Sequence, residues 1–366
     1  MKIRLKKSAK EGIALVIVML VILVLASLAA IFASSMKVET TLARHENFES
    51  EFEWVGRSGV ELARFVISEQ AKIPNEGNYE ALNQKWAGGV GGAAASNSPI
   101  SEISLENNQL GNGTFSVKIT DLERKFNINM SDQSVLQQAL TVMGVDASLT
   151  PTITDSVLDW LDKDEDTHLS GAESDYYLSL DSPYLCKNGP MGDISELLLI
   201  KGVRDNPAIY WGSSNTNHPV SAFQARSTSR PFADQNEPSY PIGLVDIFTP
   251  LSSGKININT ASQSSLQMIP GVDEGIAAGI VQLRAGPDGV EGTEDDTPLR
   301  SIGELANVPG MSRAVVQQLS PYCDVRSQTF EVEVTVQLNG VSRQYYAVLR
   351  RSSTVGPFPM LKFYWK

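Results

Sequence analysis

The feature that most constrains this chain is an uncharged, apolar stretch near its N-terminus, residues 13–36. As an α-helix rising about 1.5 Å per residue, this stretch is long enough to cross the roughly 30 Å hydrocarbon core of a membrane. Basic residues precede it, so we expect the leader to stay on the cytoplasmic side and the bulk of the chain to lie outside. These bases are Lys2, Arg4, Lys6, Lys7 and Lys10. No second apolar run of that length follows, which predicts a single membrane pass.

Three interpretations of this N-terminus compete. A secretory signal peptide cut near Ala29 or Ala30 would have an unusually long apolar region, since about 7–15 residues is the normal length. A plain signal anchor is the second. The third is a prepilin leader, residues 1–12, cut between Gly12 and Ile13 on the cytoplasmic side. We favour the leader because it explains a helix-breaking glycine at the point where the apolar run begins.

The helical pattern continues beyond the membrane segment. No proline interrupts the chain between residue 13 and Pro74. Apolar residues recur at spacings of three and four, which is the mark of a helix with one buried face. They are Phe48, Phe52, Val55, Leu62 and Val66. The pattern predicts a helix of about 60 residues, or about 90 Å, with one end in lipid and the other packed on an α+β part, residues 37–125.

Strands are predicted near both ends of the globular part. Residues 113–120 alternate between apolar and polar side chains, and so do residues 330–338. Asn339-Gly340 is a typical hairpin turn, after which residues 342–351 return as a strand. Residues 360–365 are a candidate last strand. We therefore expect residues 326–366 to complete an antiparallel sheet that begins before residue 125.

The middle of the chain, residues 126–325, is predicted to be an inserted helical domain with an internal repeat. Residues 126–136 resemble 256–266, each with an Asn-Ile-Asn motif directly after its first residue, and residues 193–203 resemble 301–311. The repeat defines two units, 126–204 and 256–322, built from helix-hairpin-helix or SAM-like motifs. Pro270-Gly271 and Pro309-Gly310 have the look of the hairpin turns.

Charge argues against nucleic acid as the partner of these hairpins. The chain has 30 Lys and Arg against 42 Asp and Glu; beyond residue 12, 25 bases and 41 acids remain, a net charge of −16. Asp273 and Glu274 stand where a DNA-binding hairpin would offer backbone N–H groups to a phosphate. The sequence contains no phosphate-binding loop, no G-x-G-x-x-G and no G-x-S-x-G motif, so we expect no enzymatic activity.

One acidic cluster has the spacing of a calcium site. Residues 155–175 contain eight acids and one base, Lys163. Within them Asp162, Asp164, Asp166, His168, Ser170 and Glu173 match ligand positions 1, 3, 5, 7, 9 and 12 of an EF-hand loop. Thr167 stands where that loop needs glycine, so the predicted geometry is modified. The candidate Ca²⁺ ligands are Asp162, Asp164, Asp166, Glu173 and Asp175; a solvated acidic loop is the alternative.

A second acidic cluster lies in residues 286–298, which are rich in glycine and contain no base. Oxygen ligands in a flexible loop suit Ca²⁺ better than Mg²⁺ or a transition metal. The candidate ligands are Asp288, Glu291, Asp295 and Asp296. We expect two Ca²⁺ sites in all, each ordering its loop.

The two cysteines, Cys186 and Cys323, fall in a part of the chain predicted to lie in an oxidising compartment. A disulfide between them is therefore expected. It would join the end of the first helical unit to the end of the second. Two buried free thiols are the alternative.

Together these features resemble the K-type minor pseudopilins of bacterial type II secretion systems. The resemblance rests on the basic leader ending in Gly12, the apolar helix from Ile13, the Asn-Ile-Asn repeats and the acidic loop between Trp160 and Tyr176-Tyr177. It covers residues 10 to about 365. It implies a pilin-like fold, in which a long N-terminal transmembrane helix packs on an antiparallel sheet that carries the helical insert.

The resemblance also implies a role. A prepilin peptidase would cut after Gly12 and methylate the amino group of Ile13. The subunit would join the I-type and J-type minor pseudopilins and cap the pseudopilus of major pseudopilins, anchored in the inner membrane with its bulk in the periplasm. Most pilins have Glu at the fifth mature position; Ile17 stands there, as in K-type members. Calcium binding and a disulfide are family features. The alternatives are a membrane-anchored DNA-uptake receptor and a type IV minor pilin.

Overall fold

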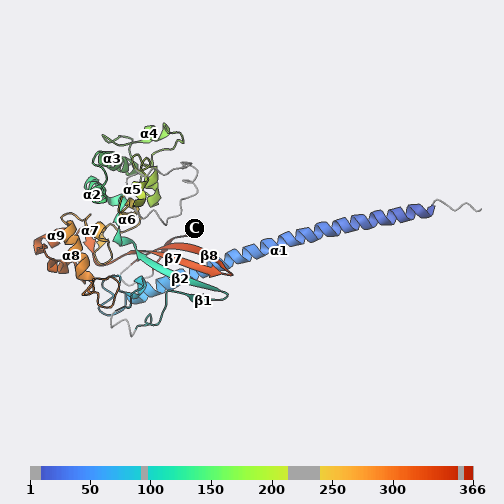
Figure 1. Cartoon of the computed structure of the whole chain (residues 1–366), viewed down its shortest axis with the longest axis horizontal. Helices are drawn as coiled ribbons and strands as arrows, with labels where there is room; N and C mark the ends of the chain where they lie inside the picture. The colour runs from blue at the N-terminus through green and yellow to red at the C-terminus, as the bar shows by residue number, and fades with distance from the viewer. Residues whose placement is uncertain (1–9, 92–97, 213–239, 353–357, 366) are drawn as a thin grey trace, which may run out of the picture.

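The computed structural model describes residues 10–91, 98–212, 240–352 and 358–365. Its dominant feature is helix α1, Lys10–Gln70, which confirms the predicted length of about 60 residues. The first half of α1 projects away from the rest of the molecule (Figure 1). Within Ala14–Thr40 the most apolar window of 18 residues has a mean hydropathy of 3.3, and no other described part of the chain covers it, as a membrane-spanning helix requires.

The globular end is organised around a five-stranded antiparallel sheet in the order β1-β2-β7-β8-β9. The strands are β1 Asn108–Leu110, β2 Gly113–Asp121, β7 Thr329–Leu338, β8 Val341–Arg350 and β9 Met360–Trp365. All of the predicted strands are present. Asn339 and Gly340 have φ of 50° and 80°, which the two central positions of a type I′ hairpin turn require.

The second half of α1 lies across this sheet, because its apolar face is matched to the strands. Phe52, Val60 and Ile67 are buried with Val332, Val334 and Val336 of β7 in one core. Two glycines allow the close approach: a Cβ at Gly56 would lie 2.7 Å from the Tyr345 ring, and one at Gly59 would lie 2.4 Å from Val334. Helix and sheet therefore share a core from which a side chain at either glycine is excluded.

Two helical units are inserted between β2 and β7. Each begins and ends with a two-residue strand, and the two strands of a unit pair in parallel: β3 Phe126–Asn127 with β4 Phe248–Thr249, and β5 Ile256–Asn257 with β6 Cys323–Asp324. These four strands were not predicted. They hold the two ends of each unit together, so that each unit leaves and re-enters the fold at one place.

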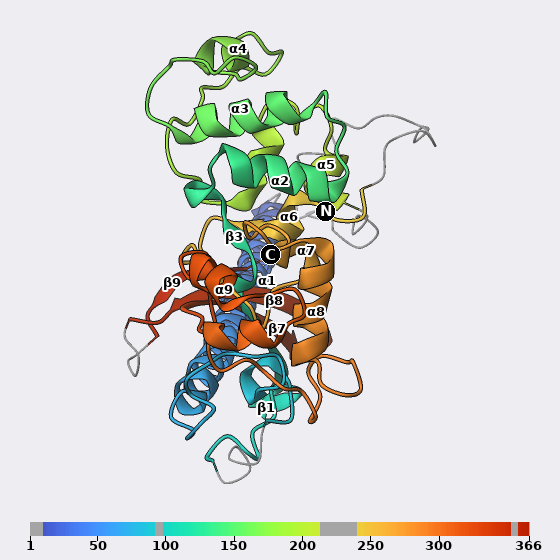
Figure 2. The ribbon, with the colours of Figure 1, turned by 90° about the vertical axis from the view of Figure 1, so that its left-hand side faces the viewer.

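The units contain short helices, with the first unit farther from the sheet and the second beside it (Figure 2). The first has α2 Gln133–Met143, α3 Thr150–Leu161, α4 Ser174–Leu178, the 3₁₀ helix η5 Ile194–Leu199, α5 Ala208–Trp211 and α6 Leu244–Ile247. The second has α7 Gln263–Leu266, α8 Glu274–Arg284, η7 Ile302–Asn307 and α9 Arg313–Leu319.

The Asn-Ile-Asn motifs make the same contacts in both units, which confirms the predicted repeat. Asn129 accepts a hydrogen bond from the Met191 backbone N–H at 2.7 Å and donates to its carbonyl at 3.1 Å. Asn259 does the same to Leu299, at 2.9 and 2.8 Å. Met191 and Leu299 each stand three residues before the 3₁₀ helix of their unit. Each asparagine therefore fixes the chain just after the long loop that follows α3 or α8.

A buried polar network joins the second unit to the sheet. Asp121, at the end of β2, accepts hydrogen bonds from Asn257, Thr260 and Ser327. Glu123 accepts from the backbone N–H groups of Ser253, at 3.0 Å, and Thr329, at 2.9 Å. Burial, and then the nearby Asp121, raises the pKa of Glu123 to about 8. Two carboxyl groups so close in a dry site cannot both ionise at neutral pH without a large cost, so the pair holds a proton.

Candidate metal centre

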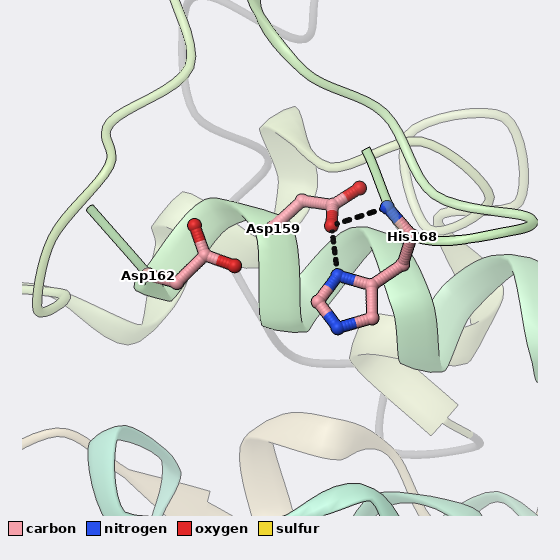
Figure 3. Close-up of side chains that lie close together, drawn as sticks. All are labelled: Asp159, Asp162 and His168. Carbon is pink, nitrogen blue, oxygen red and sulfur yellow. Dashed lines mark hydrogen bonds and ion pairs between the residues drawn. The ribbon is translucent and has the colours of Figure 1, made fainter. Parts of the chain in front are cut away.

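The first acidic loop begins where α3 ends, and the last turn of that helix contributes to the site. Asp159 and Asp162 are three residues apart, so they lie on the same side of the helix. One carboxylate oxygen from each lies with a ring nitrogen of His168 in a group whose atoms are all within 4.8 Å of one another (Figure 3). Asp159 lies in the last turn of α3, Asp162 caps the end of that helix, and the loop returns to bring His168.

Asp159 organises the returning loop. Its fully buried carboxylate accepts hydrogen bonds from the backbone N–H of His168 at 3.1 Å and of Ala172 at 2.7 Å, and it contacts the His168 Nδ1. The hydrogen bond to Asp159 raises the pKa of His168. A Cβ at Gly171 would lie 1.9 Å from Asp159 Oδ2. Gly171 therefore serves the close approach of the loop to this carboxylate, a different role from the glycine of an EF-hand.

Two other acids of the loop, Glu173 and the half-buried Asp162, have buried carboxylate oxygens without partners. Glu173 is 3% exposed, and within the described residues neither of its carboxylate oxygens accepts a hydrogen bond of good geometry. Asp162 Oδ1 is orphaned in the same way. Burial raises the pKa of Glu173 to about 7; the nearby Cys186 thiol partly offsets this, and Asp159, Asp162 and Glu165 add to it. Buried carboxylate oxygens without donors are the environment that a bound cation satisfies.

The remaining predicted ligands of this loop lie apart from that group. Asp164, Asp166 and Asp175 are exposed. Asp164 uses one oxygen to accept the backbone N–H of Asp166 at 3.0 Å, which stabilises the turn itself. Of the predicted ligands the structure places Asp162 in the group with Asp159 and His168, and Glu173 lies near enough for Asp159 and Asp162 to raise its pKa. Sequence reasoning left Asp159 out of the ligand set, although its three-residue spacing from Asp162 on a helix was the available signal.

The second acidic loop, residues 286–298, has a positive charge beside it. Arg284, the last residue of α8, is 3% exposed and forms an ion pair with Glu291. It also donates to the carbonyls of Ile258 and Ala261, each at 2.6 Å. The guanidinium therefore ties the loop to the start of the second unit.

The other acids of the second loop accept hydrogen bonds from the loop itself. Asp288 Oδ1 accepts the Val290 N–H, and Asp295 Oδ2 accepts the Asp288 N–H at 3.0 Å. Asp296 Oδ2 accepts the Gly292 N–H at 2.8 Å. Hydrogen bonds from Thr293 and Asp288 lower the pKa of Asp295. Among the described residues these carboxylates leave no orphaned buried oxygen, in contrast to Glu173.

The predicted disulfide is wrong in this structure, where both cysteines are free thiols. Cys186 is buried in the first unit and donates to the Asp159 carbonyl at 3.6 Å. Cys323 is buried in the second unit. It belongs to β6, lies opposite Ile256 of β5, and donates to the Leu319 carbonyl at 3.2 Å. Burial raises the pKa of each thiol to about 12. Each thiol has its own acceptor in its own unit, so packing within the units, rather than a covalent link, holds them.

The helix-hairpin-helix turns are formed as predicted, and their ends are not arranged for phosphate. Gly271 and Gly310 have φ of 82° and 90°. The Asp273 side chain caps α8 by accepting the Ile276 N–H at 2.8 Å. A carboxylate therefore already occupies the N-terminus of the helix, where a DNA-binding hairpin would receive a phosphate.

The residues implicated in processing and assembly lie on the free part of α1. The backbone of Gly12 and Ile13 is helical, while the leader up to residue 9 falls outside the described residues. Ile17 is 57% exposed and lies within the apolar surface of the helix. At position 17 the surface of α1 is therefore aliphatic, whereas the Glu of most pilins would place a charged group there.

An apolar N-terminal helix that continues onto an antiparallel sheet defines the class of pilin-like, membrane-anchored subunits. Two family models match segments of this chain. They are "Type II secretion system (T2SS), protein K" over residues 113–209 and "Helix-hairpin-helix motif" over residues 252–324. These matches cover β2, the first unit as far as residue 209, and the second unit.

Curated relatives and a solved structure agree. The type II secretion system protein K of Pectobacterium carotovorum is 23% identical over 217 residues, covering 54% of this chain and 60% of the relative. That of Klebsiella pneumoniae is 24% identical over 209 residues, covering 53% and 58%. The chain thus spans less than two thirds of these relatives.

The solved structure is a chain of the GspK-GspI-GspJ complex from enterotoxigenic Escherichia coli, with a TM-score of 0.60 at 17% identity, covering 88% of this chain and 99% of that one. At this identity the likeness shows a shared fold. The matches confirm the resemblance to the K-type minor pseudopilins, components of a secretion machine.

Proposed function

We propose that this protein is a minor pseudopilin at the tip of a type II secretion pseudopilus. In this role it starts and caps the filament together with I-type and J-type minor pseudopilins. The apolar part of α1 spans the inner membrane, and the sheet and helical units lie in the periplasm. The growing filament of major pseudopilins then aids the export of proteins across the outer membrane. The protein acts by assembly, without a catalytic step of its own.

The observation that carries this proposal is the place of the helical insert. The two units lie at the end of the molecule opposite the free part of α1 (Figure 1). In a helical filament each subunit contacts neighbours above and below through different surfaces. A subunit with a bulky body at its upper end leaves no room for a neighbour there. The insert therefore suits the first position of the filament and no interior position.

The surface of α1 supports the same assignment. A pilin in the interior of a filament uses a buried Glu at its fifth mature position to pair with the amino-terminal charge of its neighbour. Ile17 has no charge to offer, and an uncompensated amino group beside it in lipid would be costly. Processing between Gly12 and Ile13 by a prepilin peptidase would free α1 to join the helices of the other minor subunits.

We also propose that the first acidic loop binds Ca²⁺. Glu173 and Asp162 would supply the oxygens that lack partners, and Asp159 lies within reach of Asp162. A bound cation would remove the cost of burying Glu173, so that the loop folds with its metal. We propose the second acidic loop as a second Ca²⁺ site, with Asp288, Glu291, Asp295 and Asp296 as ligands. Because Arg284 supplies part of the positive charge there, we expect that site to contribute less to folding.

Co-purification tests the assignment. The full-length chain would be co-expressed with the I-type and J-type subunits of the same genome, extracted in detergent, and analysed by light scattering after size exclusion. We expect a complex with one copy of each subunit. A matched variant, Ile17→Glu, restores the common pilin residue and should leave the soluble contacts intact. Failure of the wild-type chain to bind either subunit would contradict the proposal.

A further inference from the structure

The chain between α4 and the 3₁₀ helix η5 connects the candidate metal centre to the sheet. Its last part, residues 186–193, forms a strap. The Asn188 side chain donates hydrogen bonds to the Asp164 carbonyl and to the Glu165 carboxylate, each at 2.9 Å. The Asn188 backbone has a φ of 49°, a left-handed conformation that asparagine tolerates better than most residues. The first end of the strap is therefore fastened to the first acidic loop.

Glu196, in the first turn of η5, holds the other end of the strap. Its carboxylate accepts hydrogen bonds from the backbone N–H groups of Gly192, at 2.8 Å, and Asp193, at 3.2 Å. It also pairs with Lys187 at 2.7 Å and accepts the indole N–H of Trp160 at 3.3 Å. Trp160 belongs to the last turn of α3, the helix that carries the metal centre. Both ends of the strap are thus tied to elements that form the metal centre.

The strap also contacts the edge of the sheet. Lys362 of β9 donates a hydrogen bond from Nζ to the Gly192 carbonyl at 2.6 Å. Burial raises the pKa of Tyr364, two residues further along β9, to about 12, and the nearby carboxylates of Glu331 and Asp193 add to the rise. β9 is the last strand of the sheet and pairs with β8. The strap therefore joins the first unit to a strand whose other edge has no strand beside it in the described part of the chain.

The acidic loop is the part of this series of contacts that a cation would change. Without a cation, the orphaned carboxylate oxygens of Asp162 and Glu173 lie close to further acids, which favours an opened loop. With a cation bound, the closed loop would hold the carbonyl of Asp164 and the side chain of Glu165, the two groups that Asn188 contacts. The coupling argued here rests on the Ca²⁺ site proposed above.

We propose that the strap couples the metal centre to the sheet edge, so that Ca²⁺ bound in the first acidic loop orders β9. In the calcium-loaded chain, the strap holds the Gly192 carbonyl in place for Lys362, and the first unit stays docked on the strand. In the calcium-free chain, the strap loosens and β9 frays more often. An edge strand presents unpaired N–H and C=O groups to other chains, so the metal controls how regularly this edge faces a neighbouring subunit.

Hydrogen–deuterium exchange of the full-length chain in detergent, without Ca²⁺ and at saturating Ca²⁺, tests the coupling. Mass spectrometry compares three segments: the acidic loop 162–173, the strap and β9. Ca²⁺ should slow exchange in all three, and in β9 by about two- to ten-fold, as expected when opening must break one more hydrogen bond. Helix α8 of the second unit is the reference. None of the contacts described above reaches it, so its exchange should be unchanged.

Two variants break the connection at different places. Lys362→Met removes the donor to Gly192, so Ca²⁺ should still slow exchange in the acidic loop and the strap but no longer in β9. Asn188→Gly keeps the left-handed backbone and removes the amide, so Ca²⁺ should slow exchange in the acidic loop alone. Lys118→Met, at an exposed position on β2, controls for the loss of a lysine and should behave like the wild-type chain.

Other outcomes would overturn the coupling. Slower exchange of the acidic loop alone in the wild-type chain would refute the coupling and leave the Ca²⁺ site standing. Slowing of β9 by the same factor in the wild-type chain and in Lys362→Met would show that the strand is ordered by another route. Equal slowing in every segment, α8 included, would mean that Ca²⁺ stabilises the whole fold. No change in any segment, with no heat of Ca²⁺ binding in calorimetry, would remove the metal site and the coupling with it.

Discussion

Replacing Glu173 by Gln tests the metal centre most sharply, because the two carboxylate oxygens are buried without partners. Burial raises the pKa of this group from an ordinary value of 4.5 to about 7. A shift of that size corresponds to about 3 kcal/mol between the charged and neutral forms. At pH 8, in the presence of a chelator, Glu173→Gln should therefore raise the free energy of unfolding by up to about 3 kcal/mol.

The pH dependence of this effect has a definite sign. Because the pKa is raised in the folded state, the folded protein holds the proton more tightly than the unfolded chain. The stability linked to that proton is fully present below pH 4.5 and is lost as pH rises through about 7. The chelated wild-type chain and the variant should therefore converge at pH 4 and diverge at pH 8.

Calcium should reverse the order of the two proteins. At a free concentration one thousand times its dissociation constant, a ligand specific to the folded state stabilises it by about 4.1 kcal/mol, which exceeds the advantage of the variant in chelator. The wild-type chain should gain this, and Glu173→Gln should gain much less. Chemical denaturation followed by tryptophan fluorescence measures both, and Asp175→Asn, an exposed acid two residues away, is the matched control. A variant that is destabilised in chelator, or that still gains fully from Ca²⁺, would refute the reasoning.

Three further predictions concern the frame that carries this site. Gly59→Leu should destabilise the packing of α1 on the sheet by at least about 2 kcal/mol, since the new Cβ alone would lie 2.4 Å from Val334. The control Glu61→Leu, at an exposed position, should change stability by less than about 0.5 kcal/mol. Equal effects of the two variants in thermal unfolding would contradict this prediction. Asn259→Ala removes both hydrogen bonds to the Leu299 backbone and should cost about 2–3 kcal/mol in denaturant unfolding. The exposed Asn78→Ala should cost little, and a neutral Asn259→Ala would show that the repeat motif does not fix the loop. In saturating Ca²⁺, the free energy of unfolding should fall by about 1.4 kcal/mol per pH unit between pH 5 and 8. The raised pKa of Glu123 makes the folded state hold a proton that the unfolded chain releases. A flat profile would mean that Asp121 and Glu123 do not share a proton in the folded state.

Much of the frame was predictable because it depends on local patterns. The length of α1 follows from an uninterrupted run of helix-compatible residues with one apolar face. The β7–β8 hairpin follows from strict alternation on either side of Asn339-Gly340, a pair that tolerates the positive φ the turn needs. In each case the residues that determine the structure lie within a few positions of one another.

The features that were missed depend on contacts between distant residues. The β3–β4 pair joins Phe126 to Phe248, and two-residue strands carry no alternation by which to recognise them. Arg284 lies just before the second acidic loop, so the composition of the loop does not include it, yet its ion pair with Glu291 changes the charge of that loop. Two cysteines were expected to pair because of their compartment, but compartment does not determine whether a fold brings two thiols together.

The central claim is that this subunit ends the filament, and its position can be seen directly. Pseudopili assembled in cells from the complete set of subunits would be labelled with gold-conjugated antibodies against the helical insert and examined by electron microscopy. The account predicts label at one end of each filament and none along its length. Label distributed along the filaments would contradict it, because the insert would then lie at interior positions, where it should leave no room for a neighbouring subunit.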